Sequence, residues 1–301
     1  MANVERVPSG PLSGSGFLKA SARAFGAVPP PALVMLGIVS VQVGAAVAKQ
    51  LFTHVGAMGT VTLRLALAAV VLLLVWRPSL RLDRRTWAVV AGFGLVLGAM
   101  NLCFYQAIVR IPLGAAVTIE FLGPLAVAVL GSRRWLDGLW ALLAATGVVL
   151  LTRADGGLDL VGAGFALGAG ACWAGYILLG AKLGSRTSDG RGLALAMAFG
   201  AVLVLPFGVA EAGSALLDPV VLIAGGAVAL LSSVVPYSLE LEALRRIPPR
   251  VFSILMSLEP AVAAVAGLVV LHEALRPAQW VAVCCVVLAS VGATRYARPE
   301  V

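Results

Sequence analysis

Apolar segments follow one another along this chain, and the short stretches between them hold most of its charged, glycine and proline residues. A helix of about 20 apolar residues crosses a hydrocarbon layer of about 30 Å. Because no water is available there, the backbone groups of each segment must bond one another, which favours helices. The pattern predicts ten membrane-spanning helices, with expected ranges Ala32–Phe52, Gly56–Trp76, Trp87–Val109, Pro112–Gly131, Leu136–Leu151, Val161–Leu183, Gly192–Ala210, Pro219–Glu240, Val251–Leu271 and Pro277–Tyr296.

The composition supports this class. Of the 301 residues, 60% are hydrophobic and 12% are charged, whereas soluble domains carry about 25% charged residues. So few charges cannot cover a water-facing surface, which excludes a soluble globular protein. We therefore expect an all-α membrane protein. Residues 1–31, which are rich in Gly, Ser and Pro, are predicted to be a disordered cytoplasmic tail, and residues 297–301 a second cytoplasmic tail.

Lys and Arg residues are distributed unevenly between the two sides of the predicted topology. If the N-terminus is cytoplasmic, 17 of the 22 lie on that side, and only Arg110, Arg153 and Arg276 lie on the other. Basic residues accumulate on the cytoplasmic side of membrane proteins, so both termini are predicted to be cytoplasmic. The net charge of +8 then faces anionic lipid of the bilayer, and no nucleic-acid partner is needed to explain it.

The chain also contains an internal repeat. Arg110-Ile111-Pro112, followed by Pro124, recurs as Arg246-Ile247-Pro248, followed by Pro260, and each matched position differs by 136 residues. Five predicted spans precede residue 155 and five follow it, so the second copy enters the membrane from the other side. Inverted repeats are typical of secondary transporters, which bind substrate between the two halves. Prolines that only start or kink helices are the alternative explanation. The halves cover residues 32–152 and 160–296.

A family resemblance rests on six segments: Ser40-Val41-Gln42-Val43-Gly44-Ala45-Ala46, Arg110-Ile111-Pro112-Leu113-Gly114, Glu120-Phe121-Leu122-Gly123-Pro124-Leu125-Ala126-Val127-Ala128, Gly168-Ala169-Gly170-Ala171-Cys172-Trp173-Ala174, Val235-Pro236-Tyr237-Ser238-Leu239-Glu240 and Leu255-Met256-Ser257-Leu258-Glu259-Pro260-Ala261. These segments closely resemble the threonine/homoserine exporters, a branch of the EamA, or drug/metabolite transporter, superfamily. The resemblance implies ten transmembrane helices as two inverted five-helix EamA repeats in a bacterial inner membrane. It also implies proton-driven export of small amino acids such as threonine and homoserine. One departure is His272-Glu273, where the family commonly has Gly-Glu.

Among the ionisable residues inside predicted spans, four stand out: Lys49, Arg64, Glu120 and Glu259. Each costs about 2.5–3.5 kcal/mol at mid-membrane, so each is a candidate for function. The carboxylates lie about 12–17 Å into their helices and, by the repeat offset, on corresponding faces. Either could hold a substrate ammonium group or couple proton entry to substrate exit, and the cations could attract a substrate carboxylate. The structural alternatives are an ion pair or helix clamp for the carboxylates, a carboxylate partner for Arg64, and interfacial exposure of the Lys49 ammonium group.

Polar and amphipathic side chains in other spans could line a substrate cavity, because a zwitterion needs hydrogen-bonding partners as well as charges. Each of them alone could instead make a helix-packing hydrogen bond. Ser232–Ser238 indicates an interrupted eighth span, and irregular backbone inside a membrane must face protein or water. This span is therefore a candidate cavity wall. The candidate lining residues are Gln42, Asn101, Tyr105, Trp173, Tyr176 and Tyr237.

No motif for catalysis, a cofactor or a metal stands out. The segment His272–Arg276 begins like HExxH but has arginine in place of the second histidine, which removes the zinc site. The chain has neither a GxSxG elbow nor a P-loop, and its four cysteines lie in apolar segments without CxxC spacing. We expect a transporter and not an enzyme. The alternatives are a transporter of another metabolite or drug and, from a different class, a lipid-modifying membrane enzyme. A homodimer is left open.

Overall fold

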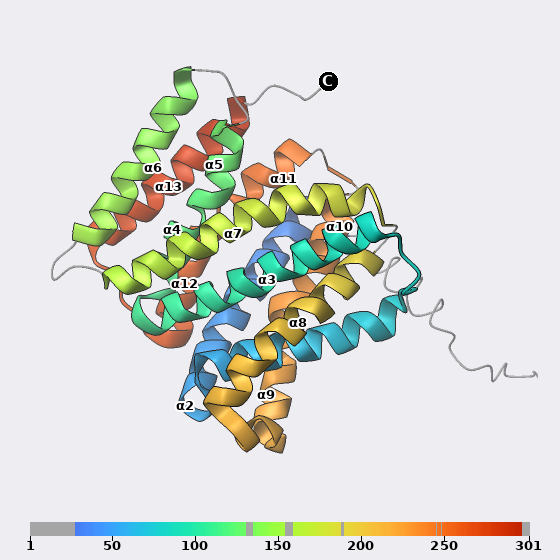
Figure 1. Cartoon of the computed structure of the whole chain (residues 1–301). Helices are drawn as coiled ribbons and strands as arrows, with labels where there is room; N and C mark the ends of the chain where they lie inside the picture. The colour runs from blue at the N-terminus through green and yellow to red at the C-terminus, as the bar shows by residue number, and fades with distance from the viewer. Residues whose placement is uncertain are drawn as a thin grey trace, which may run out of the picture.

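The computed structural model describes residues 28–130, 135–153, 159–187, 190–244, 246–247 and 249–296. Within these ranges the chain forms helices and contains no β-strand (Figure 1). Six of the described helices are long and apolar enough to cross a membrane, and three shorter helices are apolar as well. The prediction of an all-α membrane protein is confirmed. The predicted tail 297–301, residues 1–27 of the other tail, and Asp155 and Pro248 lie outside the described residues.

Each of the ten predicted ranges overlaps one or more of the described helices. Aspartates cap several of them: the Asp83 carboxylate accepts the backbone N–H groups of Arg85 and Thr86 at the start of α3. The Thr86 hydroxyl and these amides hold the pKa of the Asp83 carboxyl below its usual range. The bounds are α2 Pro30–Trp76, α3 Arg84–Arg110, α4 Leu113–Glu120, α5 Leu122–Leu130, α6 Trp135–Arg153, α7 Leu160–Gly184, α8 Arg191–Ala212, a 3-10 helix Gly213–Leu217, α9 Pro219–Ala229, a π-helical turn Leu230–Val234, α10 Val235–Leu244, α11 Pro249–Met256, α12 Glu259–Leu271 and α13 Pro277–Tyr296.

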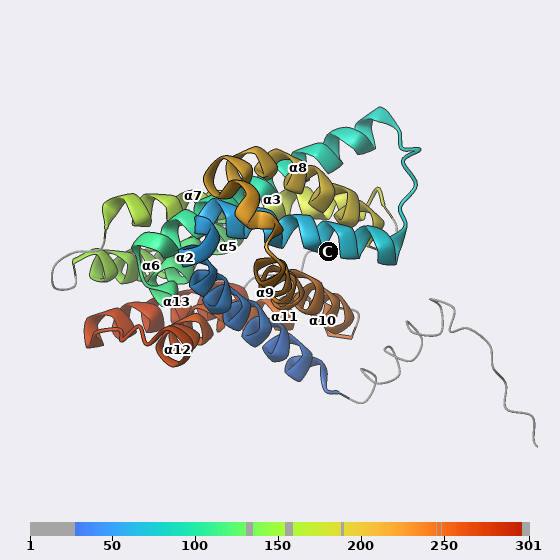
Figure 2. The same ribbon diagram turned by 90° about the horizontal axis from the view of Figure 1, so that it is seen from below.

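Helix α2 holds the first two predicted spans, joined at a kink. At Gly56 the backbone has φ 67° and ψ 178°, a conformation open to glycine and strongly disfavoured for other residues. The 47 helical residues would span about 70 Å if straight, about twice the thickness of a hydrocarbon layer. The kink therefore allows the two parts of α2 to form separate spans. Glu211 caps the second part of α2, because its Oε2 accepts the N–H groups of Met58 at 2.6 Å and Gly59 at 3.1 Å. Figure 2 shows the two parts of α2 meeting at an angle.

The fourth and ninth predicted spans are each divided into two helices, which the hydrophobic pattern did not predict. Helices α4 and α5 meet at Phe121, and α11 and α12 meet at Ser257 and Leu258. A proline lies shortly after each break, Pro124 in the fourth span and Pro260 in the ninth. Because proline has no backbone N–H, the carbonyl four residues earlier loses its helical hydrogen bond. Both segments remain apolar throughout, so the pattern alone could not reveal these breaks.

Helices from the two halves of the chain interleave. Helix α2 packs against α8 and α9, α3 against α7 and α8, α6 against α13, and α4 against α12. Figure 1 shows α3 between α7 and α8, and α6 beside α13. One large apolar core runs through α2, α3, α4, α7 and α8. Residues distant in sequence therefore meet at the centre of the protein.

Another close contact between backbones brings α7 against the junction of α4 and α5. A Cβ added at Gly170 would lie 2.6 Å from the Glu120 carbonyl oxygen, and one at Gly123 would overlap the Gly170 carbonyl. We expect Gly170→Val to lower the free energy of unfolding by about 1–3 kcal/mol or more, because the backbones must separate. Gly164→Val in the same helix is the matched control, since a Cβ there meets nothing within 4 Å. Equal melting temperatures for the two purified variants would contradict this packing.

Candidate functional site

Arg64 lies on the second part of α2 and faces the π-helical turn Leu230–Val234. Pro236 follows this turn and provides no backbone N–H, so carbonyl groups become available to side-chain donors. The Arg64 Nη2 donates to the Ser232 carbonyl at 2.8 Å, and its Nε donates to the Ser233 Oγ at 3.3 Å. The irregularity predicted in the eighth span therefore takes the form of a turn that holds a guanidinium group.

Arg64 also has an aromatic and an acidic neighbour. Its Cζ lies 5.8 Å from the centroid of the Tyr105 ring, within the range of a cation–π interaction. Glu120, the last residue of α4, interacts electrostatically with Arg64. Both charged residues are only 7% exposed. The positive charge of Arg64 offsets part of the cost of placing the Glu120 carboxylate inside the helix bundle, where a lone charge is costly.

Glu259 is the first residue of α12 and is held by Gln42 from the first part of α2. The Gln42 Nε2 donates to the Glu259 Oε1 at 3.0 Å, and both side chains are buried. A carboxylate in the first turn of a helix is stabilised by the helix dipole, whereas Glu120, in the last turn of α4, is not. The neighbouring Ser257 Oγ lies 2.7 Å from the Ser290 Oγ. The two candidate carboxylates therefore occupy electrostatically different positions.

Aromatic side chains form one side of this region. The Trp173 ring meets the Phe121 ring edge-on, with centroids 5.5 Å apart, directly beside Glu120 in sequence. Tyr176 packs against Phe93 at 4.6 Å and interacts with Tyr237 through its hydroxyl group. Tyr237 interacts electrostatically with both Arg64 and Glu259. Tyr237 therefore lies near both the cation Arg64 and the carboxylate of Glu259.

We call the residues Gln42, Arg64, Tyr105, Glu120, Ser232 and Glu259 the central cluster. Five buried side-chain polar atoms have no hydrogen-bond partner among the described residues, and four belong to this cluster. Such atoms are rare in proteins and need a partner such as water or a ligand. Their concentration beside one buried cation and two buried carboxylates makes the central cluster the candidate site for a polar ligand. The four atoms are the Gln42 Oε1, Tyr105 Oη, Ser232 Oγ and Glu259 Oε2.

Two of the predicted site residues make their described contacts elsewhere. The Lys49 Nζ lies 2.5 Å from the Glu273 Oε1, an ion pair that the sequence analysis did not predict. Contact of Lys49 with a substrate carboxylate stays a prediction. Asn101 is buried, and its Nδ2 donates to the Leu97 carbonyl at 2.9 Å within the same helix. Asn101 therefore makes a bond within its own helix, and its role in lining a substrate cavity stays a prediction.

Glu240 was missed by the sequence analysis, which treated it only as the end of the eighth span. It interacts electrostatically with Tyr176, Tyr237 and Glu259. A Cβ at Gly37 would lie 3.6 Å from the Glu240 Cγ, so Glu240 packs against the first part of α2. Its position three residues beyond Tyr237, on the same helix face, was the signal that could have identified it.

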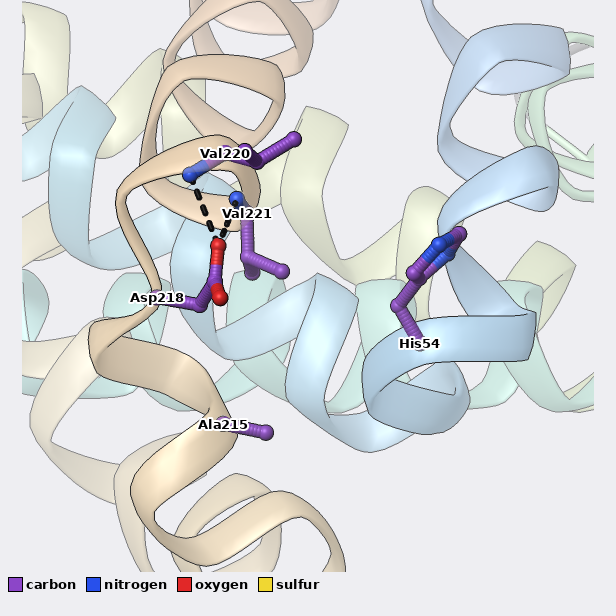
Figure 3. A pocket seen from close by; sticks show the side chains of 5 residues that line it. All are labelled: His54, Ala215, Asp218, Val220 and Val221. Atoms are coloured by element: carbon purple, nitrogen blue, oxygen red, sulfur yellow. Dashed lines mark hydrogen bonds between the residues drawn. The ribbon is translucent and has the colours of Figure 1, made fainter.

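Two surface hollows lie apart from the central cluster. Figure 3 shows one of about 380 Å³, in which Asp218 caps α9 by accepting the N–H groups of Val220 and Val221. His54 and Ala215 complete its lining. Because the Asp218 carboxylate is committed to the cap and the other lining is mostly apolar, this hollow offers little to a zwitterion. The other measures about 460 Å³ and is lined by Lys49, Phe52, Gly56, Ala57, Gln106, Val109, Arg110 and Glu211.

Comparison with known proteins identifies the family to which this chain belongs. Residues 160–295 match the model of the EamA-like transporter family. The threonine/homoserine exporter RhtA of Salmonella typhimurium is 43% identical over 275 residues, which cover 90% of this chain and 93% of the relative. The exporter of the same name from Escherichia coli (strain K12) is 42% identical over 275 residues, again with coverage of 90% and 93%. A solved crystal structure with 18% identity and a TM-score of 0.60 covers 89% of this chain and 98% of its own, and shows a similar fold. The chain therefore belongs to the EamA-like transporter family, in the branch that contains these threonine/homoserine exporters.

Proposed function

We propose that this protein exports threonine and homoserine across the bacterial inner membrane in exchange for protons. The observation that carries this proposal is the set of unpartnered buried polar atoms around Arg64, Glu120 and Glu259. A buried cation, buried carboxylates and free hydrogen-bonding atoms are what a small zwitterion with a hydroxyl group requires. The names of the close relatives point to the same substrates.

The proposed architecture is ten spans in two inverted halves, with both termini cytoplasmic. The division of two spans into shorter helices supports it. Helix α4 covers Leu113–Glu120 and α11 covers Pro249–Met256, so both ends correspond at the 136-residue offset of the sequence repeat. The interleaved packing of the halves is also expected of such a pair.

Arg64 is the proposed partner of the substrate carboxylate. Two of its five N–H donors are accounted for by Ser232 and Ser233 among the described residues, which leaves donors for a planar carboxylate. Glu259, whose Oε2 has no partner among the described residues, is the proposed partner of the ammonium group. The free hydroxyls of Tyr105 and Ser232 would receive the substrate hydroxyl.

Exchange follows if Glu259 binds either the ammonium group or a proton, but not both. On the cytoplasmic side the amino acid displaces the proton. After the cavity opens outward, a proton from the outside displaces the amino acid, and the protonated carrier returns. Glu120 remains the counter-charge that positions Arg64 in this scheme. If Glu120→Gln, and not Glu259→Gln, uncoupled threonine transport from proton movement, the roles of the two glutamates would be reversed.

Replacing Tyr105 by phenylalanine tests the hydroxyl contact. We expect the apparent affinity for threonine to fall about tenfold, since one hydrogen bond to a buried group is worth about 1.5 kcal/mol at most. Transport of 2-aminobutyrate, which lacks the hydroxyl group, should change little and serves as the internal control. Equal losses for the two substrates would remove Tyr105 from hydroxyl recognition.

Efflux from cells tests the function itself. Cells loaded with labelled threonine or homoserine and expressing the protein should lose label faster than cells with an empty vector. A protonophore should abolish the difference. If correctly inserted protein leaves both rates unchanged, these substrates are wrong, and a wider screen of metabolites is required.

A further inference from the structure

One carboxylate joins three separate elements at one end of the helix bundle. The Glu273 Oε1 pairs with the Lys49 Nζ at 2.5 Å, and its Oε2 accepts the Leu113 N–H, at the start of α4, at 2.8 Å. Glu273 follows His272, which ends α12 with φ 56°, and its own N–H bonds back to the Gly267 carbonyl at 3.0 Å. This left-handed turn directs Glu273 back over its helix. Glu273 thus ties the first part of α2, the start of α4 and the α12–α13 loop together.

The same three elements carry charged or polar members of the central cluster. Lys49 lies seven residues, or about 10 Å, beyond Gln42 on the same side of α2. Glu120 lies seven residues beyond Leu113 in α4, and α12 begins at Glu259 and ends just before Glu273. A movement that separates Lys49 from Glu273 therefore acts on helices that position Gln42, Glu120 and Glu259.

A surface hollow and an aromatic pair adjoin Lys49. Lys49 and Phe52 line the 460 Å³ hollow together with Arg110, a cation that suits a substrate carboxylate, and Glu211, which caps the second part of α2. The Phe52 ring packs on the Tyr105 ring at a centroid distance of 5.7 Å. Phe52 thus stands between the hollow and the central cluster.

We propose that the Lys49–Glu273 pair, closed in this structure, is the outer gate of the transport path. Opening breaks the ion pair, releases the start of α4 and withdraws Phe52 from Tyr105, so that the hollow becomes continuous with the central cluster. The side chains of Lys49 and Glu273 remain 21% and 18% exposed, and partly exposed pairs are weak enough to break during a transport cycle. This inference rests on the proposed function and gives Lys49 and Glu273 a positioning role outside substrate contact.

The test measures access to the cluster from outside, without substrate. In a protein whose four native cysteines are replaced by serine, Ser232→Cys introduces one thiol into the cluster. Right-side-out vesicles are treated with a membrane-impermeant maleimide, and the labelling rate is measured. We expect Lys49→Met and Glu273→Gln to raise this rate at least fivefold. The exposed Lys182→Met is the matched control and should leave the rate unchanged.

A charge swap separates gating from misfolding. In Lys49→Glu combined with Glu273→Lys the ion pair reforms, although the Leu113 N–H loses its acceptor, so labelling should return most of the way to the slow rate. Unchanged labelling in correctly inserted Lys49→Met and Glu273→Gln, or fast labelling that the swap does not reduce, would overturn the gate. Because no substrate is added, absence of threonine export would reject the proposed function without deciding this result.

Discussion

Replacing Glu259 by glutamine is expected to lower threonine export driven by a pH gradient about 100-fold. The amide keeps the size of the side chain and can still accept the bond from Gln42. It can neither take up a proton nor pair with an ammonium group, and loss of one partner of a buried charge pair costs about 2–5 kcal/mol. Initial rates in membrane vesicles, with the pH gradient imposed, measure the effect.

Glu242→Gln is the matched control. Glu242 lies in α10 and pairs with Arg246, which is not a member of the central cluster. It should transport like the parent protein. Normal gradient-driven export by Glu259→Gln would exclude Glu259 as the exchange site. The corresponding Glu120→Gln variant would then be the one expected to uncouple transport.

Replacing Arg64 by methionine is expected to raise the KM for threonine about 30- to 100-fold. The variant loses the donors proposed for the substrate carboxylate, and a charge-assisted bidentate contact is worth about 2–3 kcal/mol. Arg64→Lys should recover little of the affinity, because an ammonium group cannot reproduce the planar fork. Concentration dependence of uptake into inside-out vesicles measures the KM.

Removing Arg64 alone also leaves Glu120 without its counter-charge, so the single variant could fail to fold. The double variant Arg64→Met with Glu120→Gln restores neutrality and should recover the melting temperature but not threonine transport. Recovery of both would show that Arg64 has only the structural role. Arg81→Met, at an exposed position after α2, controls for loss of a positive charge.

The membrane class and the approximate spans could be predicted because each depends on local composition. Four irregular places in the described helices, at Gly56, Phe121, Leu230–Val234 and Ser257–Leu258, were harder to predict. Only the turn Leu230–Val234 was expected as an interruption, since serines and a proline gather there. Gly56 was placed at the start of a span, and Phe121 lies within a continuous apolar run whose break depends on a proline three residues later.

Contacts between distant helices could not be predicted. The helices are apolar on all sides, so the hydrophobic pattern does not show which face meets which neighbour. The pairing of Gln42 with Glu259 spans 217 residues, and that of Lys49 with Glu273 spans 224. The repeat placed Glu120 and Glu259 on corresponding faces, but it could not distinguish the first turn of α12 from the last turn of α4.

The charges of the central cluster would favour the proposed exchange. Its neighbourhood contains one arginine and three glutamates, counting Glu240. Uncompensated negative charge inside a membrane is costly. A carrier without a proton or a substrate ammonium group would bear that cost, which disfavours its movement across the membrane. Obligatory exchange, and not free leakage, is the expected consequence.

Purified protein in liposomes provides the most direct test of proton-coupled threonine export. The liposomes contain a pH-sensitive dye, and no pH gradient is imposed. A threonine gradient across the membrane should then drive protons in the direction opposite to threonine. Glu259→Gln should abolish this proton movement. Threonine flux without proton movement, or proton movement unaffected by Glu259→Gln, would contradict the account.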